Sequence, residues 1–537
     1  MNFSTAADLA IIAASVRTLD PDRPQASAVA FRDGTIVAVG SDAEVREACD
    51  AGTELIDGTG MSLVPGIVDG HIHPFWPEIV IGADLTRCAT LAELHRELAA
   101  ERERAGAGGW VRGWGIDYGV FHDTGIDGEL LEPAVGGAPT LVTFMDQHTA
   151  LANPRALEVA GVTGAVAFAE GSEVVVRDGR PTGELRESAA IGLVRAVAPA
   201  LTADDLRAIV LRTQAELNSL GVTGVHAMNG GPETIDLMRE LEASGELKLR
   251  SIIPLWQPPE RTFGEMEAQL RLRDERGRLW RGGVAKFFID GVIDTGTGWL
   301  CEPDALGGGT EPFWPDPDRY ARAVAMFATA GFQCVTHATG DRAVRAALDA
   351  YRSAGAAPGV MHRIEHIETL QDADLPRFAA EGVAASMQPL HMQWRRADHE
   401  DSWAGRLGRE RAARAWRTRD LLDSGALLPL GSDWAVAQHD PRIGMAWARL
   451  RRAPGRPDAP LFEPGQRLTG LEVLHGYTVA NARVVGEGAV AGQIKLGFRA
   501  DVTAFAADPV TCDADDLTEL PVRLTVVDGR AVYRGEG

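Results

Sequence analysis

The stretch VPGIVDGHIHPFW, from Val64 to Trp76, organises the rest of the chain. Its apolar run ends in Asp-Gly and is followed by two histidines, His71 and His73. Side chains at positions i and i+2 of a strand point to the same face. If the run is a buried strand, both imidazoles leave its C-terminal end together and form half of a metal site. The alternative is that they are ordinary polar residues at a strand terminus.

Length and composition indicate a large globular protein. The chain has 537 residues, of which 45% are hydrophobic and 24% charged, so it can bury a large core or several domains. The formal net charge of −23 argues against nucleic acid and an anionic membrane surface as partners. The five cysteines form no CxxC pair, so no disulfide framework or structural zinc module is expected. The N-terminal segment has neither a basic region nor a spanning apolar run, which favours a cytoplasmic protein.

The middle of the chain alternates short apolar runs with amphipathic helical stretches, which is the pattern of buried parallel strands. The strand candidates are Val64–Asp69, Val222–His226, Leu249–Leu255, Val284–Ile289, Phe332–His337, Arg363–His366, Val383–Gln388 and Leu427–Gly431. The helix candidates include Asp204–Leu220, Arg319–Ala330, Ala343–Ser353 and Ala404–Ser424. This succession predicts an α/β fold with a (β/α)8 barrel of the TIM type.

Both ends of the chain show short strands separated by tight turns. Asp33-Gly34 and Asp528-Gly529 lie between apolar runs, which is typical of hairpins. The simplest arrangement is a small composite β-sandwich of residues 1–63 and 486–537, with a barrel of residues 64–485 inserted between them. About 150 residues separate the first two barrel strands, so residues 78–205 are predicted to form an inserted subdomain over the barrel mouth.

Metal-capable side chains follow the C-terminal ends of five of these strands. They are His71 and His73 after the first strand, Lys286 and Asp290 at the fourth, His337 at the fifth, His366 at the sixth and Asp433 after the eighth. In a barrel of this type the functional site lies at that face, so these side chains are expected to converge. Their convergence favours a metal site.

In these motifs the sequence resembles the amidohydrolase superfamily, specifically the branch that includes N-substituted formamide deformylase. The shared motifs are PGIVDGHIH, KFFIDG, THATGDRAV, RIEHIE, the Gln388-Pro389 pair, GSDW and GQIKLGFRADVTAF, in family order over nearly the whole chain. The resemblance implies a divalent metal, with Zn²⁺ as first choice, bound as one or two ions. It implies as ligands His71, His73, His337, His366, Asp433 and a carboxylated Lys286 that bridges two metals. The alternative for Lys286 is an ordinary salt-bridged lysine on a strand, and for Asp433 a turn or helix cap.

The implied activity is metal-assisted hydrolysis. The metal would lower the pKa of a bound water, and Asp433 would take its proton as the hydroxide attacks a carbonyl carbon. Asp433 would then protonate the leaving amine, so the expected reaction cleaves a C–N bond of a small amide-like substrate such as an N-substituted formamide. One alternative is an esterase, lactonase or cyclic-ureide hydrolase with the same site. A second is a non-catalytic regulator with this fold.

Other residues have weaker claims to the site. Substrate contacts are predicted for Trp76, His148, Trp299 and Gln388, and packing is the alternative for the aromatic and histidine side chains. His226, at the end of the second strand, either supports the metal ligands or fills the barrel. Residues 291–314 lack the Ser-Leu-Gly-Ser-Arg run of the family and are rich in glycine, which predicts a mobile loop that affects specificity. A homodimer is the default expectation for assembly.

Overall fold

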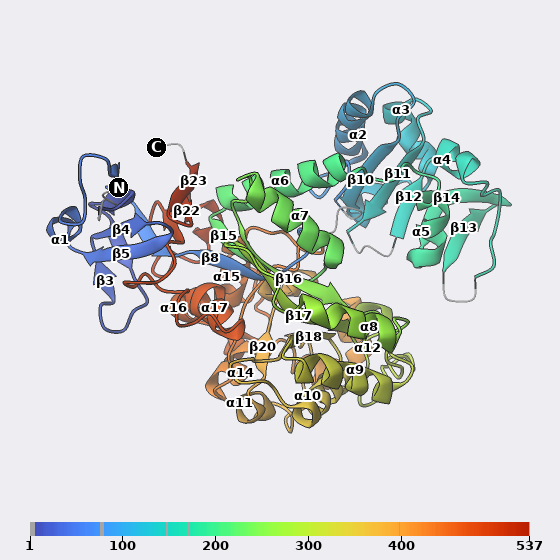
Figure 1. Cartoon of the computed structure of the whole chain (residues 1–537). Helices are drawn as coiled ribbons and strands as arrows, with labels where there is room; N and C mark the ends of the chain where they lie inside the picture. Colours follow the sequence, from blue (N-terminus) through green and yellow to red (C-terminus); the bar gives the residue numbers. More distant parts are fainter. Residues whose placement is uncertain (1–5, 76–79, 146–148, 169–171, 397, 536–537) are drawn as a thin grey trace. The chain divides into compact units, whose positions relative to one another are not determined.

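A computed structural model describes residues 6–75, 80–145, 149–168, 172–396 and 398–535 (Figure 1). The chain separates into two compact units. The first comprises residues 1–75, 213–433 and 438–537, and the second comprises residues 76–212 and 434–437. None of the helices in the described ranges is both long enough and apolar enough to cross a membrane.

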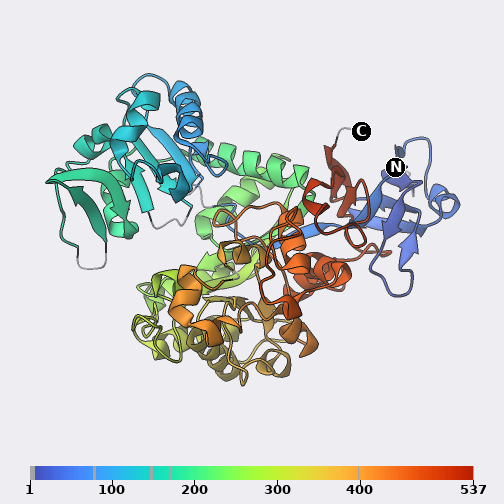
Figure 2. The same ribbon diagram turned by 180° about the vertical axis from the view of Figure 1, so that it is seen from behind.

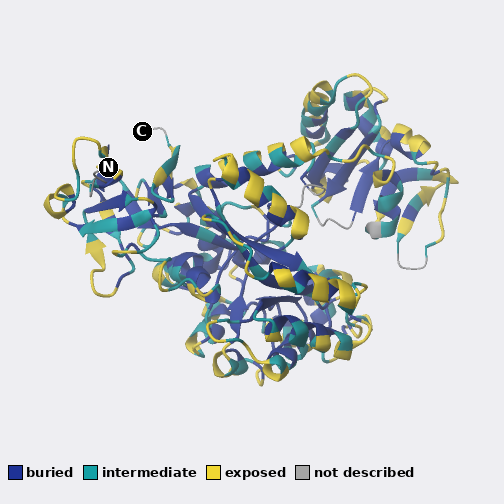
Figure 3. Cartoon of the chain, in the orientation of Figure 1, coloured by how far each residue is buried: buried dark blue, intermediate teal, exposed yellow. Residues whose placement is uncertain are grey.

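The first unit contains a seven-stranded parallel sheet that forms most of a barrel. Its order is β20 (Ala384–Ser386), β19 (Arg363–His366), β18 (Gln333–Ala338), β17 (Trp280–Phe288), β16 (Arg250–Trp256), β15 (Val222–Ala227) and β8 (Ile67–Ile72). The strands are buried, whereas the helices on the outside expose one face to solvent (Figure 3). These helices include α7 (Pro232–Ala243), α9 (Pro317–Thr329) and α10 (Asp341–Ala354). The predicted barrel is confirmed.

The eighth predicted strand, Leu427–Gly431, is reduced to an isolated bridge. Leu430 pairs in parallel with Met387, which directly follows β20. On its other side, the N–H of Gly70 in β8 donates to the Leu430 carbonyl at 3.0 Å. The segment therefore joins the last strand to the first and closes the barrel.

The first predicted strand, Val64–Asp69, proves to be two strands. β7 (Ser62–Pro65) belongs to a terminal sheet, and β8 begins at Ile67. The chain passes from one sheet to the other at Gly66, where an added Cβ would lie 2.3 Å from the Thr223 hydroxyl. A side chain has no room at this crossing, so glycine permits the close approach.

Two sheets at the ends of the chain pack face to face. One has the order β5-β4-β1-β6, and the other, β23-β22-β21-β7-β2-β3, combines both termini (Figure 2). Their strands, besides β7, are β1 (Leu9–Ile12), β2 (Ser15–Arg17), β3 (Gln25–Ala26), β4 (Ala28–Arg32), β5 (Thr35–Gly40), β6 (Glu54–Asp57), β21 (Val502–Phe505), β22 (Val522–Val527) and β23 (Arg530–Arg534). Ile11 and Phe31 of the first sheet share one core with Leu63 and Val526 of the second, which confirms the composite sandwich.

The second unit has a mixed six-stranded sheet of its own. The order is β13 (Glu173–Arg177), β14 (Arg180–Arg186), β12 (Thr149–Ala152), β11 (Thr140–Phe144), β10 (Val111–Ile116) and β9 (Ala83–Asp84). Val142 packs with Leu94 of α2 (Leu91–Ala105), whereas the neighbouring Leu141 packs with Ile191 of α5 (Glu187–Arg195). Each face of the sheet thus has its own helix and core. The boundaries at 78 and 205 and the location over the barrel mouth stay predictions.

Three of the four predicted helices are confirmed, as α6 (Ala203–Ser219), α9 and α10. The single helix predicted over Ala404–Ser424 is wrong. The segment forms α12 (Ser402–Leu407), α13 (Arg409–Ala412) and α14 (Thr418–Asp423). Gly408 has a φ of 75° and Trp416 a φ of 42°, and such left-handed residues interrupt a right-handed helix.

Candidate metal centre

The carboxyl end of β8 holds His71 and His73 against the segment that follows the eighth strand. The side chain of Asp69 accepts the N–H of His71 at 3.1 Å and the N–H of Ser432 at 2.9 Å. The N–H of Asp433 donates to the His71 carbonyl at 2.7 Å. These hydrogen bonds bring Asp433 to the two histidines although the residues are far apart in the sequence.

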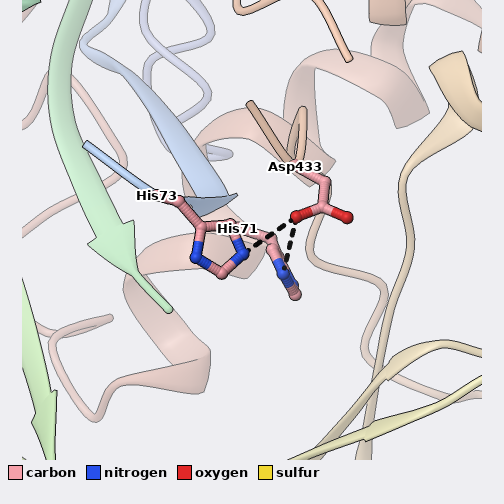
Figure 4. A group of neighbouring side chains, drawn as sticks. All are labelled: His71, His73 and Asp433. Carbon is pink, nitrogen blue, oxygen red and sulfur yellow. Dashed lines mark ion pairs between the residues drawn. The ribbon is translucent and has the colours of Figure 1, made fainter. Parts of the chain in front are cut away.

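Asp433 faces both His71 and His73 with one carboxylate oxygen (Figure 4). Its Oδ1 is 3.2 Å from His71 Nε2 and 3.1 Å from His73 Nε2. Burial alone would raise the pKa of Asp433, but the two imidazoles hold it well below its ordinary value, so the group is a carboxylate. Donor atoms of the three side chains lie within 4.8 Å of one another, which suits a shared cation.

A second group of donors surrounds the other oxygen of Asp433. Oδ2 lies 3.9 Å from His366 Nδ1 and 3.4 Å from His391 Nε2, and donor atoms of these three residues also lie within 4.8 Å of one another. His366 ends β19 with a φ of 74°, which breaks the alternation of side chains along the strand. Glu365 and His366 can therefore both face the barrel interior although they are consecutive.

His391 is a residue that the sequence-based prediction missed. It lies in η5 (Pro389–Trp394), which directly follows the seventh strand. Its ring is nearly parallel to that of His366, with 5.7 Å between the centroids. Burial lowers the pKa of His391 to about 4, so the imidazole is neutral and available as a ligand. The signal in the sequence is its position two residues after the Gln388-Pro389 pair.

Lys286 on β17 is buried without a hydrogen-bond partner. The residue is 1% exposed, and its Nζ makes no hydrogen bond to any described residue. Burial lowers the pKa of the amine to about 8, although the Glu365 and Asp433 carboxylates oppose this shift. An unpaired ammonium in a protein interior is strongly unfavourable, so this position fits a lysine that a further group neutralises.

His337 on β18 lies beside His366 but faces a carbonyl. The two ring centroids are 4.3 Å apart, and the His337 ring stacks on Phe288 at 3.7 Å. His337 Nε2 is 3.1 Å from the Gly291 carbonyl oxygen. Burial, reinforced by the charge of Lys286, lowers the pKa of His337 to about 3, so this imidazole is neutral as well.

The predicted ligands thus fall into two sets. The structure gathers His71, His73 and His366 around Asp433, with distances of 3.1–3.9 Å to its carboxylate oxygens. Lys286 and His337 lie beside this group, each within electrostatic reach of Asp433.

Asp290, which the sequence marks as metal-capable, is engaged by the backbone instead. Its carboxylate accepts the N–H groups of Trp299, Thr339 and Gly340 at 2.8–3.0 Å. Burial outweighs these hydrogen bonds and raises the pKa of Asp290 to about 7. Asp290 therefore orients the loop after β17.

That loop, residues 291–314, is tied to the segment after the seventh strand. Asp304 accepts a hydrogen bond from Arg406 at 2.7 Å, and Asp294 accepts one from Arg395 at 2.9 Å. The mobility of the loop stays a prediction.

Two of the four predicted substrate contacts, Trp76 and His148, lie outside the described residues. Trp299 is 8% exposed, and the Arg342 guanidinium lies over its ring, with Cζ 5.4 Å from the ring centroid. Gln388 is fully buried, and neither atom of its amide makes a hydrogen bond within the described part of the chain. Buried amides are rarely unpaired, so Gln388 is a stronger candidate for binding than Trp299.

Two buried glutamates complete the site and were also missed. Glu365 Oε2 lies 2.6 Å from His71 Nδ1. Burial would raise the pKa of Glu365, but neighbouring cationic groups lower it to about 2. Glu368 accepts the indole N–H of Trp403 at 2.7 Å and lies 4.0 Å from His391 Nδ1. Burial raises the pKa of Glu368 to about 7. The partners named here lie in other elements, β8, α12 and η5, so the linear sequence does not show these pairings.

Comparisons with known proteins cover nearly the whole chain. A model of the amidohydrolase family matches residues 54–533. N-substituted formamide deformylase of Arthrobacter pascens is 28% identical over 99% of both chains. Protein LONG AFTER FAR-RED 3 of Arabidopsis thaliana is also 28% identical, over 98% of this chain and 92% of its own. The structure of an uncharacterized metal-dependent hydrolase from Pyrococcus furiosus is 25% identical, with a TM-score of 0.72 over 94% of this chain and 100% of its own.

Proposed function

Because this chain belongs to the amidohydrolase family, we propose that it is a metal-dependent hydrolase that cleaves a C–N bond of a small amide-like substrate. The observation that carries the proposal is the convergence of His71, His73 and His366 on the two oxygens of Asp433. N-substituted formamides are the first substrates to test, because a relative of full length bears that activity in its name.

The donor set fits one or two divalent ions. Imidazole and carboxylate are the ligands that Zn²⁺ prefers together. Burial lowers the pKa of His73 and of His366, so both imidazoles are neutral and able to bind. The orphaned amine of Lys286 fits the same proposal, because the neutral amine could react with CO₂ to give a carbamate and a released proton, and the carbamate would supply the site with a further anionic ligand, the proposed bridge. His337 would serve as a further ligand on the side of His366.

Asp433 has the position and the charge of a general base. A divalent ion bound among these residues would supply a water of lowered pKa and would polarise the substrate carbonyl. The Asp433 carboxylate is ionised and buried, so it can accept the proton of the attacking water. Once protonated, it can donate that proton to the departing amine. His71 and His73 fix its orientation from one side and His391 from the other.

A substrate panel tests the proposal. Protein supplemented with Zn²⁺ and bicarbonate is offered N-substituted formamides and esters with the same acyl group, and release of amine or alcohol is measured. We expect amine release that a chelator abolishes and that Asp433→Asn lowers by about 10²- to 10⁴-fold.

The matched control is Asp440→Asn, because Asp440 caps α15 (Pro441–Leu450) and pairs with Arg442. This variant should keep wild-type activity. Amine release that survives both chelation and Asp433→Asn would contradict the proposal. Hydrolysis of the esters without hydrolysis of the amides would keep the metal site and reject the assignment to C–N bonds.

A further inference from the structure

We infer that Glu365 is a positioning residue that fixes the orientation and tautomer of His71, and that Arg363 holds Glu365 in place for this purpose. The inference rests on the proposed function, since it assigns His71 as a ligand through its Nε2 atom. Neither Glu365 nor Arg363 contacts the donor atoms that would surround the metal.

The contact between Glu365 and His71 leaves one nitrogen of the imidazole for the metal. Glu365 Oε2 lies 2.6 Å from His71 Nδ1, and both residues are at most 1% exposed. A carboxylate at this distance accepts a hydrogen bond, so Nδ1 carries the proton. Nε2 is then left to bind a cation shared with Asp433, whose Oδ1 lies 3.2 Å away. A hydrogen-bonded carboxylate behind an imidazole also makes it a stronger ligand.

Arg363 fixes the carboxylate from the opposite side. Its Nε forms an ion pair with Glu365 Oε1 at 2.7 Å, although neither atom makes a hydrogen bond of good geometry, so the two oxygens of Glu365 have separate partners. Nη1 of Arg363 donates to His226 Nδ1 at 3.1 Å, and Nη2 lies 3.5 Å from the Met228 sulfur. The guanidinium is therefore anchored at three atoms inside the barrel, at 1% exposure.

The sequence of β19 explains how one strand supplies both the support and a ligand. Arg363 and Glu365 are two residues apart, so both point into the barrel. Ile364 between them points outward, and the φ of 74° at His366 turns that side chain back toward the site. The RIEH segment thus carries a ligand, His366, next to the residues that position His71 of another strand.

The alternative is that Arg363 and Glu365 form a buried ion pair with a structural role alone. A structural pair would affect folding and would leave the affinity of the folded protein for metal unchanged. A positioning role predicts weaker metal binding even in variants that are well folded. Loss of such a carboxylate behind a ligand histidine typically weakens metal affinity by about 10- to 100-fold.

The experiment measures the dissociation constant and the visible absorption spectrum of Co²⁺ bound to wild type, to Glu365→Gln and to the double variant Arg363→Met with Glu365→Gln. The double variant removes both charges of the pair and so avoids a lone buried charge. The matched control is Glu487→Gln, because Glu487 is a largely buried glutamate that pairs with Arg281 and Arg499 and is not among the predicted metal ligands.

We expect both variants of Glu365 to bind Co²⁺ about 10- to 100-fold more weakly, with an altered spectrum, and Glu487→Gln to match wild type. Wild-type affinity and spectrum in the folded variants of Glu365 would overturn this inference and leave the proposed function standing. A wild-type chain that binds neither Co²⁺ nor Zn²⁺ would overturn the proposed function and this inference with it.

Discussion

The barrel interior contains two buried cationic side chains, Arg363 on β19 and Lys286 on β17, and they differ in their partners. Each is 1% exposed. Arg363 has an ion pair with Glu365 and a hydrogen bond to His226. Lys286 Nζ makes no hydrogen bond within the described ranges. A buried charge with well-placed partners is part of the scaffold, whereas one without them indicates a missing chemical group.

Lys286→Met should have the largest effect on activity, because it removes the proposed bridge between the metals. We expect the loss of about 4 kcal/mol of transition-state stabilisation, or about 10³-fold in kcat/KM. The measurement is steady-state kinetics with the best substrate of the panel, in the presence of Zn²⁺ and bicarbonate. Wild-type kinetics in this variant would reduce Lys286 to a packing residue.

Arg363→Met tests the other half of the comparison, which concerns stability. The substitution would leave Glu365 charged and buried without its main partner, at a cost of about 3–5 kcal/mol. Calorimetry of the metal-free protein should show a clear drop in melting temperature, which Glu365→Gln in the same chain should partly restore. An unchanged melting temperature in the single variant would mean that the pair contributes nothing to the scaffold.

Metal-free Lys286→Met should be more stable than wild type, in contrast to Arg363→Met, because it removes an unpaired buried amine. The pKa of Lys286 falls from 10.5 to about 8 on folding. Below about pH 8 the amine is protonated in both the folded and the unfolded state. Burial of the charged amine then destabilises the folded state by about 3 kcal/mol. Between about pH 8 and 10.5 the unfolded state holds the proton more tightly, so the stability of wild type rises with pH.

The melting temperature of metal-free Lys286→Met should therefore exceed that of wild type at pH 7, and the difference should shrink as the pH approaches 10.5. Calorimetry at several pH values in the presence of a chelator measures this trend. A constant difference across the range would show that Lys286 does not titrate in the folded protein.

Arg352→Met provides the smallest expected effect and serves as the matched control for both buried cations. Arg352 lies on α10, where its side chain is 59% exposed and pairs with Asp349 at 3.0 Å. Exposed pairs of this kind contribute about 0.2–1 kcal/mol. Its melting temperature and activity should be close to those of wild type. A loss as large as that of Arg363→Met would mean that burial does not explain the contrast.

Most of the barrel could be predicted from the sequence because each strand is a local feature. β15 to β18 each contain several apolar residues close together in the sequence, and the hydrogen-bonding partners of parallel strands follow from their order. The eighth strand was harder, because Leu430 forms only an isolated bridge to Met387. The break of the predicted helix over Ala404–Ser424 depends in part on Trp416, whose left-handed φ of 42° has no sequence signature.

The site could be predicted as far as single residues at strand ends were concerned. His71, His73, His366 and Asp433 are recognisable from their motifs. Pairings across the barrel could not be predicted from motifs, because the contact of Glu365 with His71 joins residues 294 positions apart. His391 was missed because it follows its strand within a 3₁₀ turn, where alternation no longer applies.

The most direct test of the central claim is the metal content per chain, measured by elemental analysis on wild type and Lys286→Ala purified without chelator and with bicarbonate. The proposed bridged site predicts about two equivalents in wild type and a clear decrease in the variant. About one equivalent that survives Lys286→Ala would leave a mononuclear histidine site and contradict the bridging lysine. No metal in wild type, with no activity after metal is added back, would contradict the assignment as a metal-dependent hydrolase.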